Sequence, residues 1–160
     1  MRNELLAAAL LLLACGVNNP PPPASTRTVA AAGPRIIFPD GDVVHVEVAA
    51  DDPTRQQGLM YRDQLPADRG MIFFFTQRGN YPFWMKNTLI PLDMVWIDDQ
   101  RRIVHVAHDV QPCKADPCPS VPPGAEARYV LEVAAGVAAR HSLANGQTLR
   151  FEGMDNVVVR

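Results

Sequence analysis

The residues best suited to chemistry gather in the segment 81–98, which reads YPFWMKNTLIPLDMVWID. Lys86 is the only lysine of this segment, and it directly follows Trp84 and Met85. A lysine is rarely buried without an anionic partner, and Asp93, at the head of an apolar run, is the natural partner. The segment therefore predicts a small polar group in apolar surroundings.

Three interpretations of this group compete. In the structural one, Lys86 and Asp93 form an ion pair or satisfy backbone groups of the loop. In the binding one, Arg62, Lys86 and Asn87 line a cleft for an anionic or hydroxyl-rich ligand, and Trp84 forms a stacking wall. In the third, Lys86 and Asp93 are catalytic, but no histidine or serine has the spacing of a nucleophile and its base. We therefore predict no catalytic residue, and the ligand-binding candidates are Arg62, Trp84, Lys86, Asn87 and Asp93.

Metal binding has weaker support in the sequence. His105 and His108 lie three positions apart in a strand-like run, which directs them to opposite faces. Thioether sulfurs bind Cu(I), but methionine also fills irregular cores, and the M-x-x-M spacing is absent. The methionines concerned are Met60, Met71, Met85 and Met94. We predict neither a metal nor a cofactor.

Composition fits a single globular domain with a tail. The chain has 160 residues, of which 48% are hydrophobic and 20% charged, and its formal net charge is -2. This length is sufficient for a hydrophobic core. The sequence has no run of basic residues, so it lacks the electrostatic signature of a nucleic-acid binder.

The first 14 residues are typical of an export signal. Arg2 precedes ten apolar residues, a run too short to cross a bilayer but suited to a secretory signal. The run ends in LLACG, which resembles the lipobox of bacterial lipoproteins, in which Cys15 would be lipidated. The alternatives are an ordinary cleaved signal, or an uncleaved anchor with an incidental cysteine. Residues 15–34, rich in proline and alanine, would then form a tether, and 35–160 the folded domain.

Two cysteines remain if Cys15 is lipidated. Cys113 and Cys118 form an even pair, and an exported chain meets an oxidising compartment, so we expect a disulfide between them. The alternative is a metal or redox pair, which the C-x4-C spacing does not favour.

The elements that must position the site are mostly strands. Alternating or continuous apolar runs predict strands at 35–38, 43–49, 71–75, 83–85, 93–98, 103–110, 129–133, 148–151 and 157–159. Helices are predicted from the N-cap Asp52 to residue 57, where Gly58 ends the helix, and at 136–143. The loop 111–124 is rich in proline. We expect a mainly β, single-domain sandwich or barrel with two short helices.

Four motifs occur in the same order as in a known family. They are GLMxR at 58–62, GMxFxF at 70–75, FWMKNTxxPLDM at 83–94 and YVLEVxAG at 129–136. Together they resemble domain-of-unknown-function family 192, also called uncharacterised protein family 0127, over roughly residues 44–151. The resemblance implies a jelly-roll-like β sandwich. It implies no established biochemical role, so the motif residues can be carried over only as candidate site residues.

These observations lead to one expectation and two alternatives. We expect an exported lipoprotein, anchored to the membrane and facing the periplasm, that binds a small molecule or glycan without catalysis. Alternatively it is a hydrolase or transferase acting on envelope components, or a structural module that binds an envelope protein. A binding module should show a cleft lined by Trp84 and Lys86. An enzyme should add a base with a displaced pKa, whereas a partner-binding module should show a flat apolar patch.

Overall fold

The computed structural model describes residues 33–114 and 116–160. The predicted signal, Cys15 and nearly all of the tether therefore lie outside the described residues. Among the residues described, no helix has both the length and the apolar character needed to cross a membrane.

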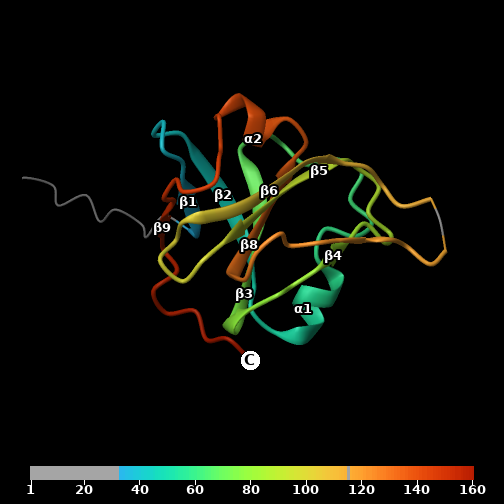
Figure 1. Cartoon of the computed structure of the whole chain (residues 1–160), viewed down its shortest axis with the longest axis horizontal. Coiled ribbons are helices and arrows are strands. Elements are labelled where there is room, and N and C mark those ends of the chain that lie inside the picture. The colour runs from blue at the N-terminus through green and yellow to red at the C-terminus, as the bar shows by residue number, and fades with distance from the viewer. Residues whose placement is uncertain (1–32, 115) are drawn as a thin grey trace, which may run out of the picture.

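Nine strands and two short helices make up the described chain, with α1 and α2 at opposite ends of the main sheet (Figure 1). The elements, in chain order, are β1 (Arg35–Ile37), β2 (Val43–Ala49), α1 (Asp52–Gln57), β3 (Arg69–Gly79), β4 (Phe83–Trp84), β5 (Leu92–Ile97), β6 (Ile103–Val110), β7 (Ser120–Val121), β8 (Ala127–Ala134), α2 (Val137–Arg140) and β9 (Arg150–Glu152). The fold is thus mainly β with two short helices, as predicted.

Seven strands form one sheet in the order β6-β5-β8-β3-β2-β1-β9, and β4 pairs with β7 in a separate two-stranded sheet. β2 and β3 run parallel because α1 and its following loop carry the chain back across the sheet. The other strand pairs are antiparallel.

The two edges of the large sheet approach one another, so that the sheet curls into a half-barrel. Arg102, just before β6, pairs with Thr148, just before β9. Two backbone hydrogen bonds flank this bridge. Ile103 N donates to Gln147 O at 2.8 Å, and Leu149 N donates to Arg101 O at 2.9 Å. The edge strands are therefore joined at one end.

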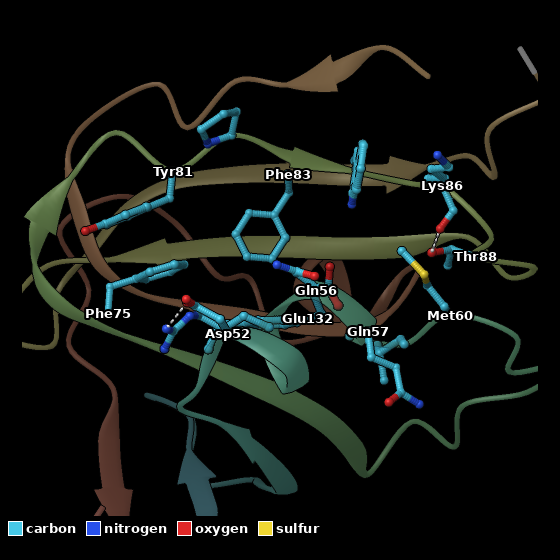
Figure 2. Close-up of a pocket in the computed structure, with 16 residues that line it drawn as sticks. Asp52, Gln56, Gln57, Met60, Phe75, Tyr81, Phe83, Lys86, Thr88 and Glu132 are labelled. Atoms are coloured by element: carbon cyan, nitrogen blue, oxygen red, sulfur yellow. Dashed lines mark hydrogen bonds and ion pairs between the residues drawn. The ribbon is translucent and has the colours of Figure 1, made fainter. Parts of the chain in front are cut away.

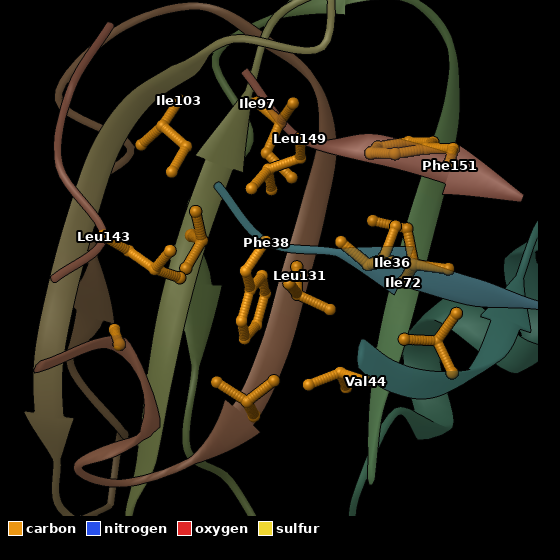
Figure 3. Packing of buried hydrophobic residues seen from close by; sticks show 14 of the residues in the cluster. Ile36, Phe38, Val44, Ile72, Ile97, Ile103, Leu131, Leu143, Leu149 and Phe151 are labelled. Atoms are coloured by element: carbon orange, nitrogen blue, oxygen red, sulfur yellow. The ribbon is translucent and has the colours of Figure 1, made fainter. Parts of the chain in front are cut away.

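Alternation along the strands separates two apolar clusters. On one face, which carries α1 and the segment 81–88, the buried side chains include Met71, Phe73, Met94 and Trp96. The other face forms the inside of the half-barrel, where the packed residues include Ile36, Val44, Ile72, Leu131 and Phe151 (Figure 3). Because side chains alternate across a strand, neighbouring residues of β3, β5 and β8 serve different clusters.

The start of α1 differs from the prediction by one residue. Asp51, not Asp52, is the N-cap: its side chain accepts from the backbone N of Thr54 at 2.9 Å, and the Thr54 hydroxyl accepts from the backbone N of Asp51 at 3.3 Å. Gly58 ends the helix, as predicted, with φ 48°, and a Cβ atom at this position would lie 3.4 Å from the Phe73 ring.

Other segments also differ from the prediction: α2 is shorter than the predicted helix 136–143, and β7 lies within the predicted loop 111–124. β3 extends beyond the predicted strand 71–75 as far as Gly79, which still pairs with Ala127 of β8. The predicted strand at 157–159 is not formed, since no described strand pairs with those valines.

A disulfide joins Cys113 and Cys118, with an S–S distance of 2.08 Å. It closes the loop that leads from β6 to β7. β7 in turn pairs with β4, where Trp84 faces Ser120 in the register. The proline-rich loop therefore supports the segment that carries the predicted site.

Candidate functional site

A pocket of about 260 Å³ lies between α1 and the segment 81–88, on the outer face of the half-barrel. Figure 2 shows Phe75 and Tyr81 at one end of this pocket, Lys86 and Thr88 at the other, and Glu132 between them. The residues that line it are Asp52, Arg55, Gln56, Gln57, Gly58, Leu59, Met60, Phe73, Phe75, Tyr81, Pro82, Phe83, Trp84, Lys86, Thr88 and Glu132. Two segments that are remote in the sequence thus form its walls, and the sheet forms its floor.

Aromatic rings make one wall of the pocket rigid. Phe75 and Tyr81 stack with ring centroids 3.6 Å apart. Phe83 meets Phe73 edge-on at 4.9 Å and Trp96 at 6.0 Å. The Trp96 indole N–H donates to the Tyr81 carbonyl at 2.9 Å. Because ring packing of this kind fixes orientation as well as area, the wall is formed before any ligand arrives.

Glu132 is the unexpected member of the site. It lies on β8, where Met71 of β3 and Met94 of β5 are its register partners. Glu132 is only 4% exposed, and no described residue donates a hydrogen bond to its carboxyl group. Burial raises the pKa of Glu132 to about 8, since an apolar site disfavours the charged form. The carboxyl group is therefore mainly neutral at pH 7.

The sequence itself carries a signal for this residue. The run Tyr129–Val133 reads YVLEV, and a strand buried on both faces leaves no solvent-facing position for a glutamate. A charged residue in such a strand needs a partner or a function.

Close packing of β3 against β8 holds the Glu132 backbone in place. A Cβ atom on Gly70 would lie 2.6 Å from the Glu132 carbonyl oxygen and 3.0 Å from a methyl carbon of Val133. Only glycine permits this approach, which accounts for the glycine at the start of the GMxFxF motif.

Two cations lie at the rim of the pocket, in different circumstances. Arg55 is tied down: it forms an ion pair with Asp52 at 2.6 Å, donates to the Phe74 carbonyl at 2.9 Å and lies 5.7 Å from the Phe75 ring centroid. Lys86 is exposed, with its Nζ 5.4 Å from the Trp84 ring centroid. No carboxylate of the described chain pairs with it.

Trp84 and Lys86 are thus the two predicted site residues that line the pocket. Trp84 is 47% exposed, which leaves ring surface available. Asn87 lies outside the lining and shapes the loop instead. It adopts φ 56°. Its side-chain amide donates to the Tyr61 hydroxyl at 2.9 Å, and its backbone carbonyl accepts from the backbone N of Tyr61 at 2.8 Å.

Arg62 and Asp93 lie away from the pocket. The Arg62 guanidinium makes two hydrogen bonds to Glu47, at 2.5 and 2.8 Å, and this pairing raises the pKa of Arg62 and lowers that of Glu47. Arg62 borders a separate small hollow beside β2.

Asp93 is fully buried, and its two carboxyl oxygens accept from the backbone N of Asp109 and of Ala138, each at 2.8 Å. The expected Lys86–Asp93 ion pair is not formed. Asp93 does satisfy backbone groups, as the structural interpretation allowed, but those groups belong to β6 and α2. It therefore links both elements to β5.

Groups suited to metal binding lie elsewhere. Asp40, Asp42 and His141 have ligand atoms within 4.8 Å of one another at the turn between β1 and β2. The His141 Nδ1 is 2.7 Å from Asp40, and this hydrogen bond lowers the pKa of Asp40. Among the methionines, Met71, Met85 and Met94 are buried as core side chains, whereas Met60 lines the pocket.

Comparison with known proteins gives a family and two solved structures. The model of DUF192, described as "Uncharacterized ACR", matches residues 35–151. A crystal structure from Sinorhizobium meliloti 1021, described as a "putative transcription regulator", shares 35% identity over 74% of this chain and 91% of its own, with a TM-score of 0.64. A protein of unknown function from Novosphingobium aromaticivorans DSM 12444 shares 29% identity over 75% and 84% of the two chains, with a TM-score of 0.66. No curated protein matches the chain.

Proposed function

This chain belongs to the DUF192 family, and we propose that it binds a small molecule or short glycan unit in the pocket between α1 and β4. One observation carries the proposal. A preformed aromatic pocket contains a buried carboxyl group, Glu132, for which the described chain supplies no hydrogen-bond donor.

The chemistry of the lining supports binding. A buried polar group without a partner destabilises the fold, and a ligand that supplies the partner recovers that free energy. The lining also includes Trp84 and Lys86, as expected of a binding module. The net charge of -2 and the absence of a basic run disfavour DNA as the ligand.

The binding test uses the two tryptophans of the chain. Trp84 is 47% exposed at the pocket, whereas Trp96 is fully buried, so a ligand should change the fluorescence of Trp84. Native mass spectrometry of protein purified from its own membranes should reveal a bound mass that a Trp84→Ala, Phe83→Ala double variant lacks. The Val158→Ala variant, at an exposed site outside the lining, is the control. Equal ligand-free mass spectra for all three proteins, with no fluorescence change on addition of membrane extract, would rule out ligand binding in the pocket.

Catalysis on the bound molecule is a second candidate, and Glu132 favours it. A neutral carboxylic acid in an apolar site is suited to give its proton to the leaving oxygen of a glycoside or ester, while water supplies the hydroxyl that replaces it. Incubation with a muropeptide digest, analysed by mass spectrometry, should then give products that the Glu132→Gln variant does not form. Identical product profiles with and without the protein would contradict catalysis and leave binding as the proposed function.

We further propose that the domain is held at a bacterial membrane by lipid on Cys15. The support is the LLACG sequence after an apolar run. Cells grown with labelled palmitate should label the protein, and Cys15→Ser should remove the label and release the protein from the membrane fraction. A Cys15→Ser protein that stays labelled would contradict this anchor.

A further inference from the structure

We propose that the ligand is a small zwitterion, with a cationic nitrogen against Glu132 and an anionic group at Lys86. This inference rests on the proposed binding function and adds the chemical class of the ligand. Amino acids and betaines belong to this class.

The floor of the pocket, where Glu132 lies, calls for a positive charge. Glu132 is one of two carboxyl groups in the lining, and the other, Asp52, already pairs with Arg55. Glu132 has apolar neighbours in the sheet, Met71 and Met94. A carboxylate there is strongly stabilised by a nearby ligand cation, because the attraction between opposite charges is stronger in apolar surroundings than in water.

The aromatic walls favour the same charge. The rings of this pocket already receive cations of the protein, with Arg55 near Phe75 and Lys86 near Trp84. Phe83 and Glu132 both line the pocket (Figure 2). A nitrogen cation beside an aromatic ring and a carboxylate is held by both.

The outer end of the pocket calls for a negative charge. Lys86 is exposed, its ammonium lacks a carboxylate partner in the described chain, and its contact with Trp84 places it at the rim. Figure 2 shows Lys86 at one end of the pocket and Glu132 in the middle. A ligand that spans the two therefore needs opposite charges at its two ends.

The volume limits the size of this ligand. About 260 Å³ is less than the several hundred Å³ typical of pockets for drug-sized molecules. The pocket thus suits a molecule the size of an amino acid or a betaine rather than an extended chain.

The pH dependence of binding separates a cationic ligand from a neutral one. The charged groups that line the pocket with Glu132 are Asp52 and Arg55 on α1 and Lys86 after β4. A cation binds the ionised carboxylate, so binding must release the proton of Glu132. Affinity for a permanently charged cation then rises by about tenfold per pH unit until the pKa of Glu132 is reached. A neutral hydroxylated ligand, which accepts the proton of the acid in a hydrogen bond, binds more weakly as the pH rises.

The experiment is isothermal titration calorimetry of the full chain with four probes: glycine betaine, tetramethylammonium, acetate and N-acetylglucosamine. Betaine should bind most tightly, and titrations at pH 7 in buffers of different ionisation enthalpy should show release of close to one proton. Glu132→Gln should weaken both betaine and tetramethylammonium at least tenfold. Lys86→Met should weaken betaine but leave tetramethylammonium unchanged. Glu126→Gln and Lys114→Met, at exposed sites outside the pocket lining, are the matched controls.

The outcomes distinguish this inference from the binding function itself. If N-acetylglucosamine binds and the charged probes do not, the pocket does bind ligands, but the assignment of a zwitterionic ligand is wrong. If betaine binds equally to wild type, Glu132→Gln and Lys86→Met, the assignment of the two charges is wrong. If no probe binds and the protein also purifies without a ligand, the proposed function itself fails.

Discussion

Glu132 keeps an ionisable group in surroundings that favour its neutral form. In the folded chain its pKa lies at about 8, against a usual value of 4.5. Below pH 4.5 the carboxyl group is protonated in both the folded and the unfolded chain. As the pH rises from 4.5 to 8 the unfolded chain releases this proton while the folded chain retains it, so the free energy of unfolding falls. Above pH 8 the loss is complete.

The Glu132→Gln variant removes this contribution. We expect it to be more stable than the wild type at pH 8.5 by a few kcal/mol, with the difference vanishing below pH 4.5. Urea unfolding of both proteins between pH 4 and pH 9 measures the difference. A constant difference across this range would show that Glu132 does not titrate abnormally.

Substitutions of Asp93 and of Lys86 should differ clearly in their effect on the free energy of unfolding. Asp93→Asn replaces one acceptor oxygen by an NH₂ group that faces a backbone N–H, and it should cost about 3 kcal/mol. Lys86→Met, at an exposed site, should change stability by less than about 0.5 kcal/mol. Thermal or urea unfolding checks both. Equal losses would mean that the two side chains depend on one another after all.

At the scale of elements, the pocket depends on the contact between β3 and β8. These strands pair antiparallel through the middle of the sheet, and each contributes residues to the pocket floor. Gly70 sets how closely they approach at the Glu132 carbonyl. Any change in that spacing therefore moves Glu132 relative to the aromatic wall.

Gly70→Ala should accordingly destabilise the protein by about 2 kcal/mol or more, because the new methyl overlaps backbone rather than a flexible side chain. Amide exchange should increase in β3 and β8 before it increases in β1. Gly33→Ala, where a Cβ meets nothing within 4 Å, is the control. A Gly70→Ala protein as stable as this control would refute the close approach.

The pattern of apolar residues predicted a strand well where the strand depends mainly on its own local sequence. β2 and β6 have the predicted bounds because valine and isoleucine recur along them. The valines at 157–159 have the same pattern, but a strand also needs a partner, which local sequence does not reveal. The pocket was only half predicted for the same reason: Trp84 and Lys86 lie within one motif, whereas Glu132 gains its role only from α1 and β4, far away in the chain.

At the scale of the whole molecule, the disulfide loop supports one wall of the pocket. Cys113 N donates to the Met85 carbonyl at 3.4 Å, and β7 pairs with β4 beyond the disulfide. The loop contacts the segment 83–88 at both ends, while the seven-stranded sheet holds together without it.

Replacing both Cys113 and Cys118 by serine should therefore loosen the pocket more than the fold. We expect a stability loss of about 2 kcal/mol, with faster amide exchange at Trp84 and Ser120 and little change in β3 or β8. Hydrogen exchange with mass spectrometry resolves these segments. Uniform acceleration over the whole chain would show that the disulfide supports the sheet as well.

The position of β9 has a consequence for how the chain comes into being. β1, the first strand, pairs on one side with β2 and on the other with β9, the last strand. The bridge between Arg102 and Thr148 also needs residues close to β9. A chain that emerges N-terminus first, from a ribosome or through a membrane pore, cannot complete its sheet until residue 152 is free. The pairing of β1 with β9 therefore forms last, and a chain cut short before β9 leaves the edge of β1 open to other strands.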